Sequence, residues 1–155
     1  MAKIHKEKFA DLIREHKISM YRLAFGILCN KEDAEDAVGE AIIKAYEHLD
    51  SLRDEDKFRQ WIMQIVANEA RKSYGKKKRV ELAKDMEIYE TAHYDEHDEL
   101  WGIVLTLEEK YRAVIVLYYY DQMKIKEISK ILHITEGTVK SRLSRAKGQL
   151  KRMLN

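Results

Sequence analysis

Polar side chains near the C-terminus occur at the spacing of one exposed helix face. They are Glu136, Thr138, Lys140, Ser141, Ser144 and Arg145. Lys and Arg donate hydrogen bonds to guanine acceptors or to phosphate oxygens, and Ser and Thr can contact either group. Val139 and Leu143 stand four residues apart and would anchor the opposite face of the same helix on an apolar core. The pattern therefore predicts a helix that presents a polar, partly basic face to DNA.

A shorter amphipathic helix precedes this one and would support it. Its apolar positions are Ile125, Ile128, Ile131 and Leu132. Thr135 is a good N-cap for the second helix because its hydroxyl accepts a hydrogen bond from an orphan backbone N–H. His133 stands in the turn, where a glycine that tolerates positive φ is usual. Histidine visits that region more readily than β-branched residues do, so we expect a modest strain at this departure. Two short helices joined by a tight turn predict a helix-turn-helix, and a solvated basic surface helix is the alternative.

The composition of the whole chain favours an all-α protein. Its 155 residues contain no proline and only 6 glycines, whereas strand-rich folds need turn residues at regular intervals. Hydrophobic residues make up 45% of the chain and charged residues 36%, which suits one compact domain or two small ones with a solvated surface. No apolar run resembles a signal peptide or reaches the length of a membrane span. We therefore expect a cytoplasmic protein without stable membrane insertion.

Apolar periodicity predicts three helices in the first half of the chain. Residues 9–28 would form one helix, or two nearly continuous ones. Residues 33–49 would form the next, with acidic residues crowding its N-terminal turn, where they complement the helix dipole. Residues 57–74 would form the third, closed by Gly75 and the basic run behind it. Three helices around one core make a first domain.

The second half is expected to begin with a linker and continue into a second helical domain. Residues 80–97 are strongly acidic and lack a convincing period, which indicates a linker. Residues 100–107 predict a helix, and Thr106 with Glu109 could form the capping box of the next one. The run at 113–120 is so apolar that its helix is expected at the centre of the domain.

Charge is distributed in blocks along the chain. Residues 71–79 hold six Lys or Arg, and residues 137–155 hold six more without any acid. Between them, residues 81–99 hold eight Asp or Glu and one Lys. Basic blocks suit a polyanionic partner, although a solvated surface is the plainer explanation.

Enzyme chemistry has little support in the sequence. Cys29 is the only cysteine, so the sequence contains neither an intrachain disulfide framework nor a thiolate cluster for zinc. His93 and His97 stand four residues apart and could offer two metal ligands, but they fall in the expected linker, where a chance surface pair is the simpler explanation. Neither a glycine-rich phosphate loop nor a credible nucleophile–base pair is present. We expect neither catalysis nor a cofactor.

Three blocks in a fixed order resemble the extracytoplasmic-function (ECF) sigma factors, the small two-domain class of bacterial sigma factors. The blocks are residues 33–46, residues 58–70 with the basic tail that follows, and residues 136–146. The third block also fits other transcription factors, whereas all three together are specific.

The resemblance implies a division of the chain into two working domains. A domain at residues 1–79 would bind core RNA polymerase and open the −10 promoter element. A linker at 80–97 would join it to a domain at 98–155 that reads the −35 element as duplex. A DNA-binding regulator that never touches polymerase is the rival interpretation, but it leaves the acidic pattern of the first domain unexplained.

Polymerase contacts are implied for Asp36 and Glu40, which match acidic positions that the family docks on the clamp of the largest subunit. Their i, i+4 spacing puts both carboxylates on one helix face. Gly39 stands between them where the family usually has Gln, and glycine inside a helix costs roughly 1 kcal/mol relative to Ala. The flap of the second-largest subunit and an anti-sigma factor are further partners that the resemblance implies.

Opening of the −10 element is implied for Leu52 and Asn68, which match positions where the family captures an unstacked base. The Asn68 amide can both donate to and accept from a base edge. Basic side chains would hold phosphates, namely Arg71, Lys72, Lys76, Lys77, Lys78 and Arg79. Trp61 is a candidate stacking platform, but its spacing with Phe58 and Ile65 favours a place in the core.

In the third block, the resemblance assigns the −35 base contacts to Lys140, Ser141, Ser144 and Arg145. Arg142 would contact a phosphate, and Glu136 and Thr138 would flank the helix entrance. Many family members carry a bulkier residue at the position of Ser144, so we expect an altered −35 preference.

Overall fold

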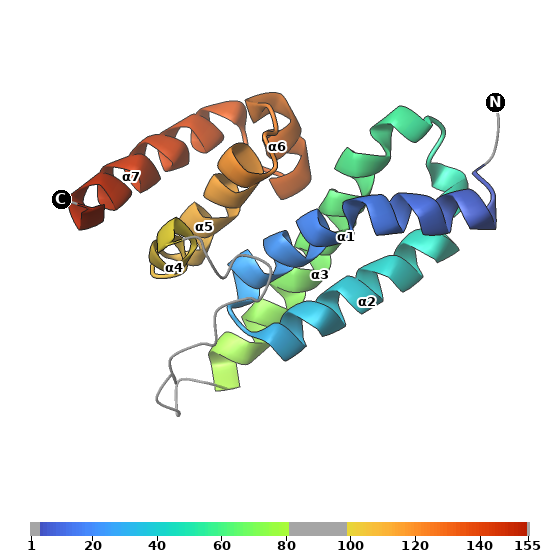
Figure 1. Ribbon diagram of the computed structural model, residues 1–155, viewed down its shortest axis with the longest axis horizontal. Helices are drawn as coiled ribbons and strands as arrows, with labels where there is room; N and C mark the ends of the chain where they lie inside the picture. The colour runs from blue at the N-terminus through green and yellow to red at the C-terminus, as the bar shows by residue number, and fades with distance from the viewer. Residues whose placement is uncertain (1–3, 81–98, 155) are drawn as a thin grey trace.

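The computed structural model describes residues 4–80 and 99–154, which form two helical units (Figure 1). Every regular element within these ranges is a helix, and the prediction of an all-α protein with two small helical domains is confirmed. The acidic linker expected at 80–97 and the pair His93 and His97 lie, apart from Val80, outside the described residues. None of the described helices is long and apolar enough to cross a membrane.

The first unit is a bundle in which each of three long helices packs on the other two. The helices are α1 (Lys6–Leu28), α2 (Lys31–Glu47) and α3 (Phe58–Val80), and the short 3-10 turns η1 (Leu49–Ser51) and η2 (Glu55–Lys57) join α2 to α3. Residues 9–28 therefore belong to a single helix, and the helix expected at 33–49 begins and ends two residues earlier.

Local capping explains the tight connection between α1 and α2. Cys29 ends α1 in the left-handed conformation at φ 51°, and its backbone N–H donates to the carbonyl of Phe25 at 2.7 Å. Asn30 then caps α2, because its side-chain oxygen accepts from the backbone N–H of Asp33 at 2.9 Å. Glu32 and Asp33 occupy the first turn of α2, where the helix dipole favours negative charge.

The end expected for the third helix is wrong. α3 does not stop at Gly75 but continues through the basic run to Val80. A single interior glycine costs only about 1 kcal/mol, and Lys and Arg are good helix formers, so the basic run extends the helix rather than ending it. The basic residues 76–79 therefore follow Arg71 and Lys72 on the same helix.

The second unit contains α4 (Glu99–Val104), α5 (Glu109–Ile115), α6 (Ile125–Leu132) and α7 (Glu136–Leu154). α5 continues into η5 (Val116–Tyr120), a π-helical turn. The apolar run expected at the centre is buried from residue 113 to residue 117, but Tyr118 and Tyr120 are only partly buried and Tyr119 is 44% exposed. The capping box predicted at Thr106 is wrong, because its hydroxyl instead donates to the carbonyl of Ile103 at 2.6 Å at the end of α4.

The predicted helix-turn-helix is confirmed as α6 and α7. His133 ends α6 in the left-handed conformation at φ 56°. The hydroxyl of Thr135 accepts from the backbone N–H of Thr138 at 3.1 Å and so caps α7. The hydroxyl of Ser129 donates to the carbonyl of Ile134 at 2.5 Å, which fixes the turn between the two helices.

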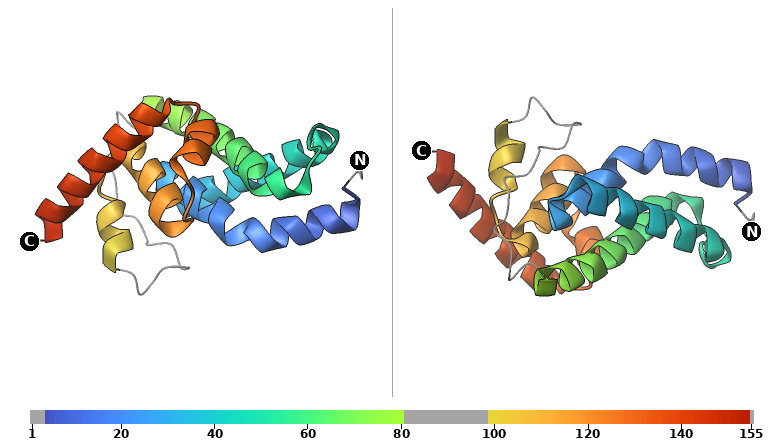
Figure 2. Two further views of the ribbon diagram at one scale, coloured as in Figure 1. Left: turned by 90° about the horizontal axis from the view of Figure 1, so that it is seen from above. Right: turned by 90° about the horizontal axis from the view of Figure 1, so that it is seen from below.

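The two units are packed against each other. α5 and η5 lie on α1, and α6 lies on α3. Both views in Figure 2 place α7 at the outer edge of the second unit, away from α2. Nothing in the local sequence pattern predicted this contact, which joins residues that are as many as 102 positions apart.

Candidate nucleic-acid interface

The outer face of α7 carries the side chains predicted to read DNA. Lys140, Ser141, Ser144 and Arg145 are exposed, as is Glu136 at the helix entrance, while Thr138 and Arg142 are partly buried. Apolar residues anchor the other face, with Val139 and Ala146 0% exposed and Leu143 5% exposed. The cap holds the N-terminus of α7, and the buried inner face holds the helix on the core. The polar side chains of the outer face therefore project together toward solvent.

The residues predicted for the −10 element differ in their exposure. Asn68 is exposed on α3, but Leu52 is 8% exposed and packs into the core of the first unit. The Leu52 side chain is therefore largely shielded from solvent, whereas the Asn68 side chain is open to it. Trp61 was considered either as a stacking platform for a base or as a core residue, and it is neither fully exposed nor fully buried. It is partly buried, and its ring packs on Phe58 with 5.8 Å between the ring centroids.

The basic side chains of α3 have different partners. Arg71 is already engaged, since its Nη1 donates to the carbonyl of Leu132 at 2.7 Å and its Nε lies 3.8 Å from Glu109 Oε1. Lys72 is exposed, with its Nζ 3.6 Å from Glu69 Oε2. The side chains of Lys76, Lys77, Lys78 and Arg79 fall outside the described part of the chain.

The acidic pair predicted for polymerase docking lies on the outer face of α2. Asp36 and Glu40 are both exposed, and together with Ala37 they line a pocket of about 290 Å³. The remaining wall comes from α3, which contributes Glu69, Lys72 and Ser73. The pocket therefore combines acidic side chains from two helices with one exposed lysine.

Glu69 and Lys44 are members of this face that the sequence patterns did not identify. Lys44 Nζ donates to Glu69 Oε2 at 2.7 Å across the contact between α2 and α3, and this bond raises the pKa of Lys44. Lys44 and Glu69 are 25 positions apart. Helical spacing rules relate residues only three or four positions apart, so they cannot predict this pair. The bond holds the Glu69 carboxylate beside the acidic pair.

Gly39 lies in open space between the two acids. A Cβ atom added there would meet no heavy atom within 4 Å, so packing does not require glycine at this position. Replacement of Gly39 by Ala is expected to raise the free energy of unfolding by about 0.5–1 kcal/mol, because alanine loses less backbone entropy on folding.

Urea denaturation of the two proteins measures this gain. Gly26→Ala is the matched control, because its added Cβ would lie 3.1 Å from Val116 Cγ2 and the crowding would offset the entropic gain. An unchanged or lower stability of Gly39→Ala would contradict the absence of a packing role for Gly39.

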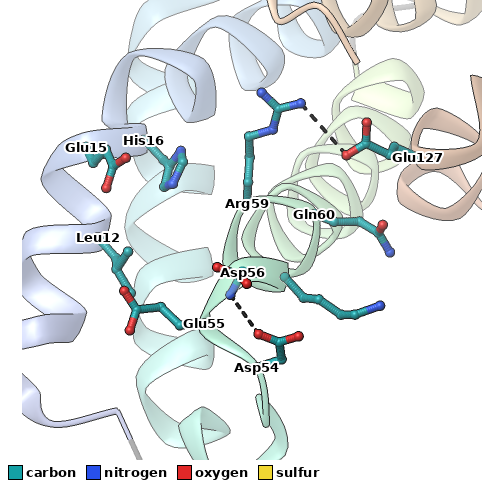
Figure 3. Close-up of a pocket in the computed structure, with 10 residues that line it drawn as sticks. Leu12, Glu15, His16, Asp54, Glu55, Asp56, Arg59, Gln60 and Glu127 are labelled. Atoms are coloured by element: carbon teal, nitrogen blue, oxygen red, sulfur yellow. Dashed lines mark hydrogen bonds and ion pairs between the residues drawn. The ribbon is translucent and has the colours of Figure 1, made fainter. Parts of the chain in front are cut away.

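A larger pocket of about 590 Å³ opens between the two units (Figure 3). It is lined by Leu12, Glu15, His16, Asp54, Glu55, Asp56, Lys57, Arg59, Gln60 and Glu127. Arg59 Nη2 reaches across it to Glu127 Oε2 at 3.8 Å, and burial lowers the pKa of His16. Neither Leu52 nor Asn68 lines this pocket. Among the described residues, no cluster of His, Cys, Asp and Glu could hold a metal ion.

Two family models match the chain in the order of its helical units. Sigma-70 region 2 matches residues 12–80, and sigma-70 region 4 matches residues 97–150. The ECF RNA polymerase sigma factor SigW of Bacillus subtilis is 32% identical over 96% of this chain and 90% of its own length. RNA polymerase sigma factor SigV of the same organism is 32% identical over 91% of this chain and 87% of its own length.

Two solved structures share the fold across both units. CnrH in complex with the cytosolic domain of CnrY has a TM-score of 0.71 and 24% identity, covering 97% of this chain and 89% of CnrH. The sigma factor RpoE in complex with the anti-sigma factor NepR from Bartonella quintana has a TM-score of 0.75 and 23% identity. That comparison covers 93% of this chain and 96% of RpoE.

Proposed function

Because this chain belongs to the ECF sigma factors of the sigma-70 family, we propose that its helical units divide promoter recognition between them. As a member of the family, the chain directs promoter-specific transcription initiation by RNA polymerase and is not an enzyme. The rival interpretation, a regulator that never contacts polymerase, is set aside by this membership. The proposal assigns residues 1–79 to polymerase docking and −10 opening, and residues 98–155 to the −35 duplex.

Reading of the −35 element is assigned to the exposed face of α7. Lys140, Ser144 and Arg145 would reach base edges, Ser141 would assist them, and Arg142 would hold a phosphate. The single observation behind this assignment is that α7 is held on the core by one face while its polar face stays exposed. Its N-terminus is capped by Thr135 and its inner face is buried through Val139 and Leu143, while the polar face is left exposed.

Opening of the −10 element is assigned to α3. Asn68 is exposed and has an amide that can pair with a displaced base, and Lys72 on the next turn is exposed and would exchange its contact with Glu69 for a phosphate. The basic residues at 76–79 continue the same helix and would add salt-sensitive, sequence-independent attraction. Arg71 belongs to this set only when it is released from Leu132 and Glu109.

Docking on the polymerase clamp is assigned to the acidic face of α2, with the second unit left to meet the flap. Replacing both Asp36 by Asn and Glu40 by Gln is expected to weaken binding of core polymerase about tenfold, because exposed carboxylates steer and hold a basic partner. Competition for core polymerase between labelled wild type and unlabelled variant, at two salt concentrations, measures the loss.

Glu35→Gln is the matched control for this prediction. Glu35 is an exposed neighbour on α2, but one residue of rotation turns it about 100° away from Asp36. The control removes one negative charge and the double variant removes two. A free-energy loss for the control about half that of the double variant would therefore point to net charge rather than to a docking face.

An anti-sigma partner and a cytoplasmic location complete the proposal. CnrH and the Bartonella RpoE were each solved with a bound protein, named for RpoE as an anti-sigma factor. The same two-unit fold supports a partner of that kind for this chain, and its work on polymerase would place it in the cytoplasm.

Run-off transcription tests the division of labour directly. Purified bacterial core polymerase, with and without this chain, is supplied with a library of genomic fragments. Promoter-specific transcripts that depend on the chain are expected. Their absence with a folded chain would overturn the assignment, and the promoters recovered supply the DNA for the variants considered below.

A further inference from the structure

The polar side of α7 continues beyond the residues assigned to the −35 element. Those residues end at Arg145, whereas the helix runs on to Leu154 and carries Lys151 and Arg152 in its last turn. Both of these cations are exposed. The C-terminal end of α7 lies at one extremity of the molecule in Figures 1 and 2. This half of the helix therefore presents positive charge that the assignment to the −35 element does not use.

Arg152 lies on the same side of α7 as Arg145. The two residues stand seven positions apart, just under two turns, so their side chains leave the helix within about 20° of each other. Leu143 stands nine positions before Arg152 and is therefore on the opposite, buried side. Lys151 stands six positions after Arg145 and is turned about 120° away from it. Arg152, rather than Lys151, thus extends the face that Arg145 occupies.

Gly148 leaves room for Arg152 to fold back along the helix. A Cβ atom added at Gly148 would lie 3.8 Å from Arg152 Nη1. The guanidinium therefore lies over Gly148, one turn closer to Arg145 than the backbone of Arg152, in keeping with the lean of helical side chains toward the N-terminus. A longer side chain at position 148 would compete for this space.

The charges around Arg152 leave it available to an anion. Residues 137–155 contain six Lys or Arg and no acid. Among the described residues, no carboxylate forms an ion pair with Arg152. Lys147, in contrast, is turned toward η5, where its Nζ lies 5.6 Å from the centroid of the Tyr119 ring. A guanidinium can donate two parallel hydrogen bonds to a phosphate, which makes a phosphate a fitting partner for Arg152.

The length of α7 indicates where on DNA this side chain would lie. A recognition helix contacts base edges with its N-terminal residues. The 19 residues of α7 span about 28 Å. The major groove winds around the duplex, so a straight helix of this length leaves the groove toward its C-terminal end and meets the phosphates of the groove wall. Arg152 lies about 10 Å beyond Arg145 along the axis, which corresponds to about three base pairs.

We propose that Arg152 binds a backbone phosphate beside the −35 element, and that Gly148 is the positioning residue that lets its guanidinium fold back toward the groove. The proposal rests on the assignment of −35 reading to α7. Continuity with that face and charge complementarity both favour duplex DNA as the partner. Because phosphates are alike at every base pair, this contact adds affinity without sequence preference.

Fluorescence anisotropy of the full chain on a −35 duplex from a selected promoter, over a series of salt concentrations, tests the contact. Arg152→Ala is expected to bind roughly threefold to tenfold more weakly at low salt, and its slope of log affinity against log salt is expected to shrink by about one. Base substitutions within the element should penalise Arg152→Ala as much as the wild type, in contrast to Arg145→Ala.

Lys151→Ala is the matched control, because it removes the same charge from the neighbouring position. It is expected to change affinity less than twofold, and a loss equal to that of Arg152→Ala would overturn the proposal by pointing to net charge. A lower stability of Arg152→Ala in urea with unchanged DNA binding would also overturn it. In that case Arg152 would serve only the negative end of the α7 dipole.

Gly148→Leu separates position from charge, since it keeps every cation and replaces glycine with a better helix former. It is expected to lose most of the affinity that Arg152→Ala loses, and the two changes together should lose little more than Arg152→Ala by itself. Wild-type binding by a folded Gly148→Leu, or losses that add in the double variant, would overturn the positioning role of Gly148.

Shortened duplexes locate the contact. Two duplexes end at the −35 element, one on its upstream side and the other on its downstream side. The difference between wild type and Arg152→Ala is expected to vanish on one of them and to persist on the other. Persistence on both would overturn a contact beside the element.

Arg145→Ala, measured in parallel, distinguishes failure of this contact from failure of the proposed function. If Arg145→Ala weakens binding of the full duplex and Arg152→Ala does not, the phosphate contact is overturned and the reading of the −35 element by α7 stands. If both variants bind like the wild type, the assignment of the −35 element to α7 fails, and the contact proposed for Arg152 fails with it.

Discussion

Replacing Arg145 by Ala is expected to weaken binding of the −35 duplex by roughly 5-fold to 150-fold. Arg145 is exposed on the outer face of α7, two residues after Leu143, which anchors the helix. A guanidinium that contacts guanine acceptors contributes about 1–3 kcal/mol of discrimination, and alanine removes it without disturbing the buried side of the helix. Fluorescence anisotropy of a −35 duplex from a selected promoter measures the loss.

Sequence dependence separates a base contact from simple charge. Arg145→Ala is expected to tolerate substitutions in the −35 element better than the wild type does, because the missing contact no longer penalises a wrong base. Lys151→Ala is the matched control, since Lys151 is an exposed cation on the same helix beyond the predicted face. If Lys151→Ala lost as much affinity for the −35 duplex as Arg145→Ala, and tolerated base substitutions in that element equally well, base reading by Arg145 would be contradicted.

Replacing Asn68 by Ala is expected to leave the closed promoter complex intact but to reduce the open complex about tenfold. Asn68 is exposed on α3, and its amide would hydrogen-bond an unstacked base of the −10 element. Losing one or two such bonds corresponds to about 1.4 kcal/mol, a factor of ten in the opening equilibrium. Permanganate reactivity of unpaired thymines measures the opened fraction.

Arg145→Ala and Asn68→Ala are expected to impair different steps of initiation, so each is a control for the other. Arg145→Ala is expected to form fewer closed promoter complexes, but those that form should open as in the wild type. Asn68→Ala is expected to form as many closed complexes as the wild type, but a smaller fraction of them should open. If Asn68→Ala reduced binding of the −35 duplex instead, the assignment of −10 opening to α3 would fail.

Most of the local structure followed from the sequence. The helix-turn-helix, the cap at Thr135 and the left-handed turn at His133 were all predicted, and all are present. These features depend on residues within a few positions of one another, so spacing and side-chain type determine them. The misplaced end of α3 shows the limit of such rules, since one glycine lowers helix stability without ending the helix.

The candidate site was only partly accessible to the same reasoning. Spacing placed Asp36 and Glu40 on one exposed face, and the structure keeps them there. Residue spacing could not place Glu69 beside this acidic pair. Glu69 reaches the pair only because α3 packs on α2, and its carboxylate is held there by a hydrogen bond from Lys44.

The sequence by itself determined which helices form, which faces of them are polar, and the family to which the chain belongs. Only the tertiary structure decided that Arg71 binds Leu132 rather than standing free, and that Arg112 caps α1 against Gly26. The reason is physical: helix periods and caps are local, whereas Gly26 and Arg112 lie 86 positions apart and meet only after both helical units have folded and docked.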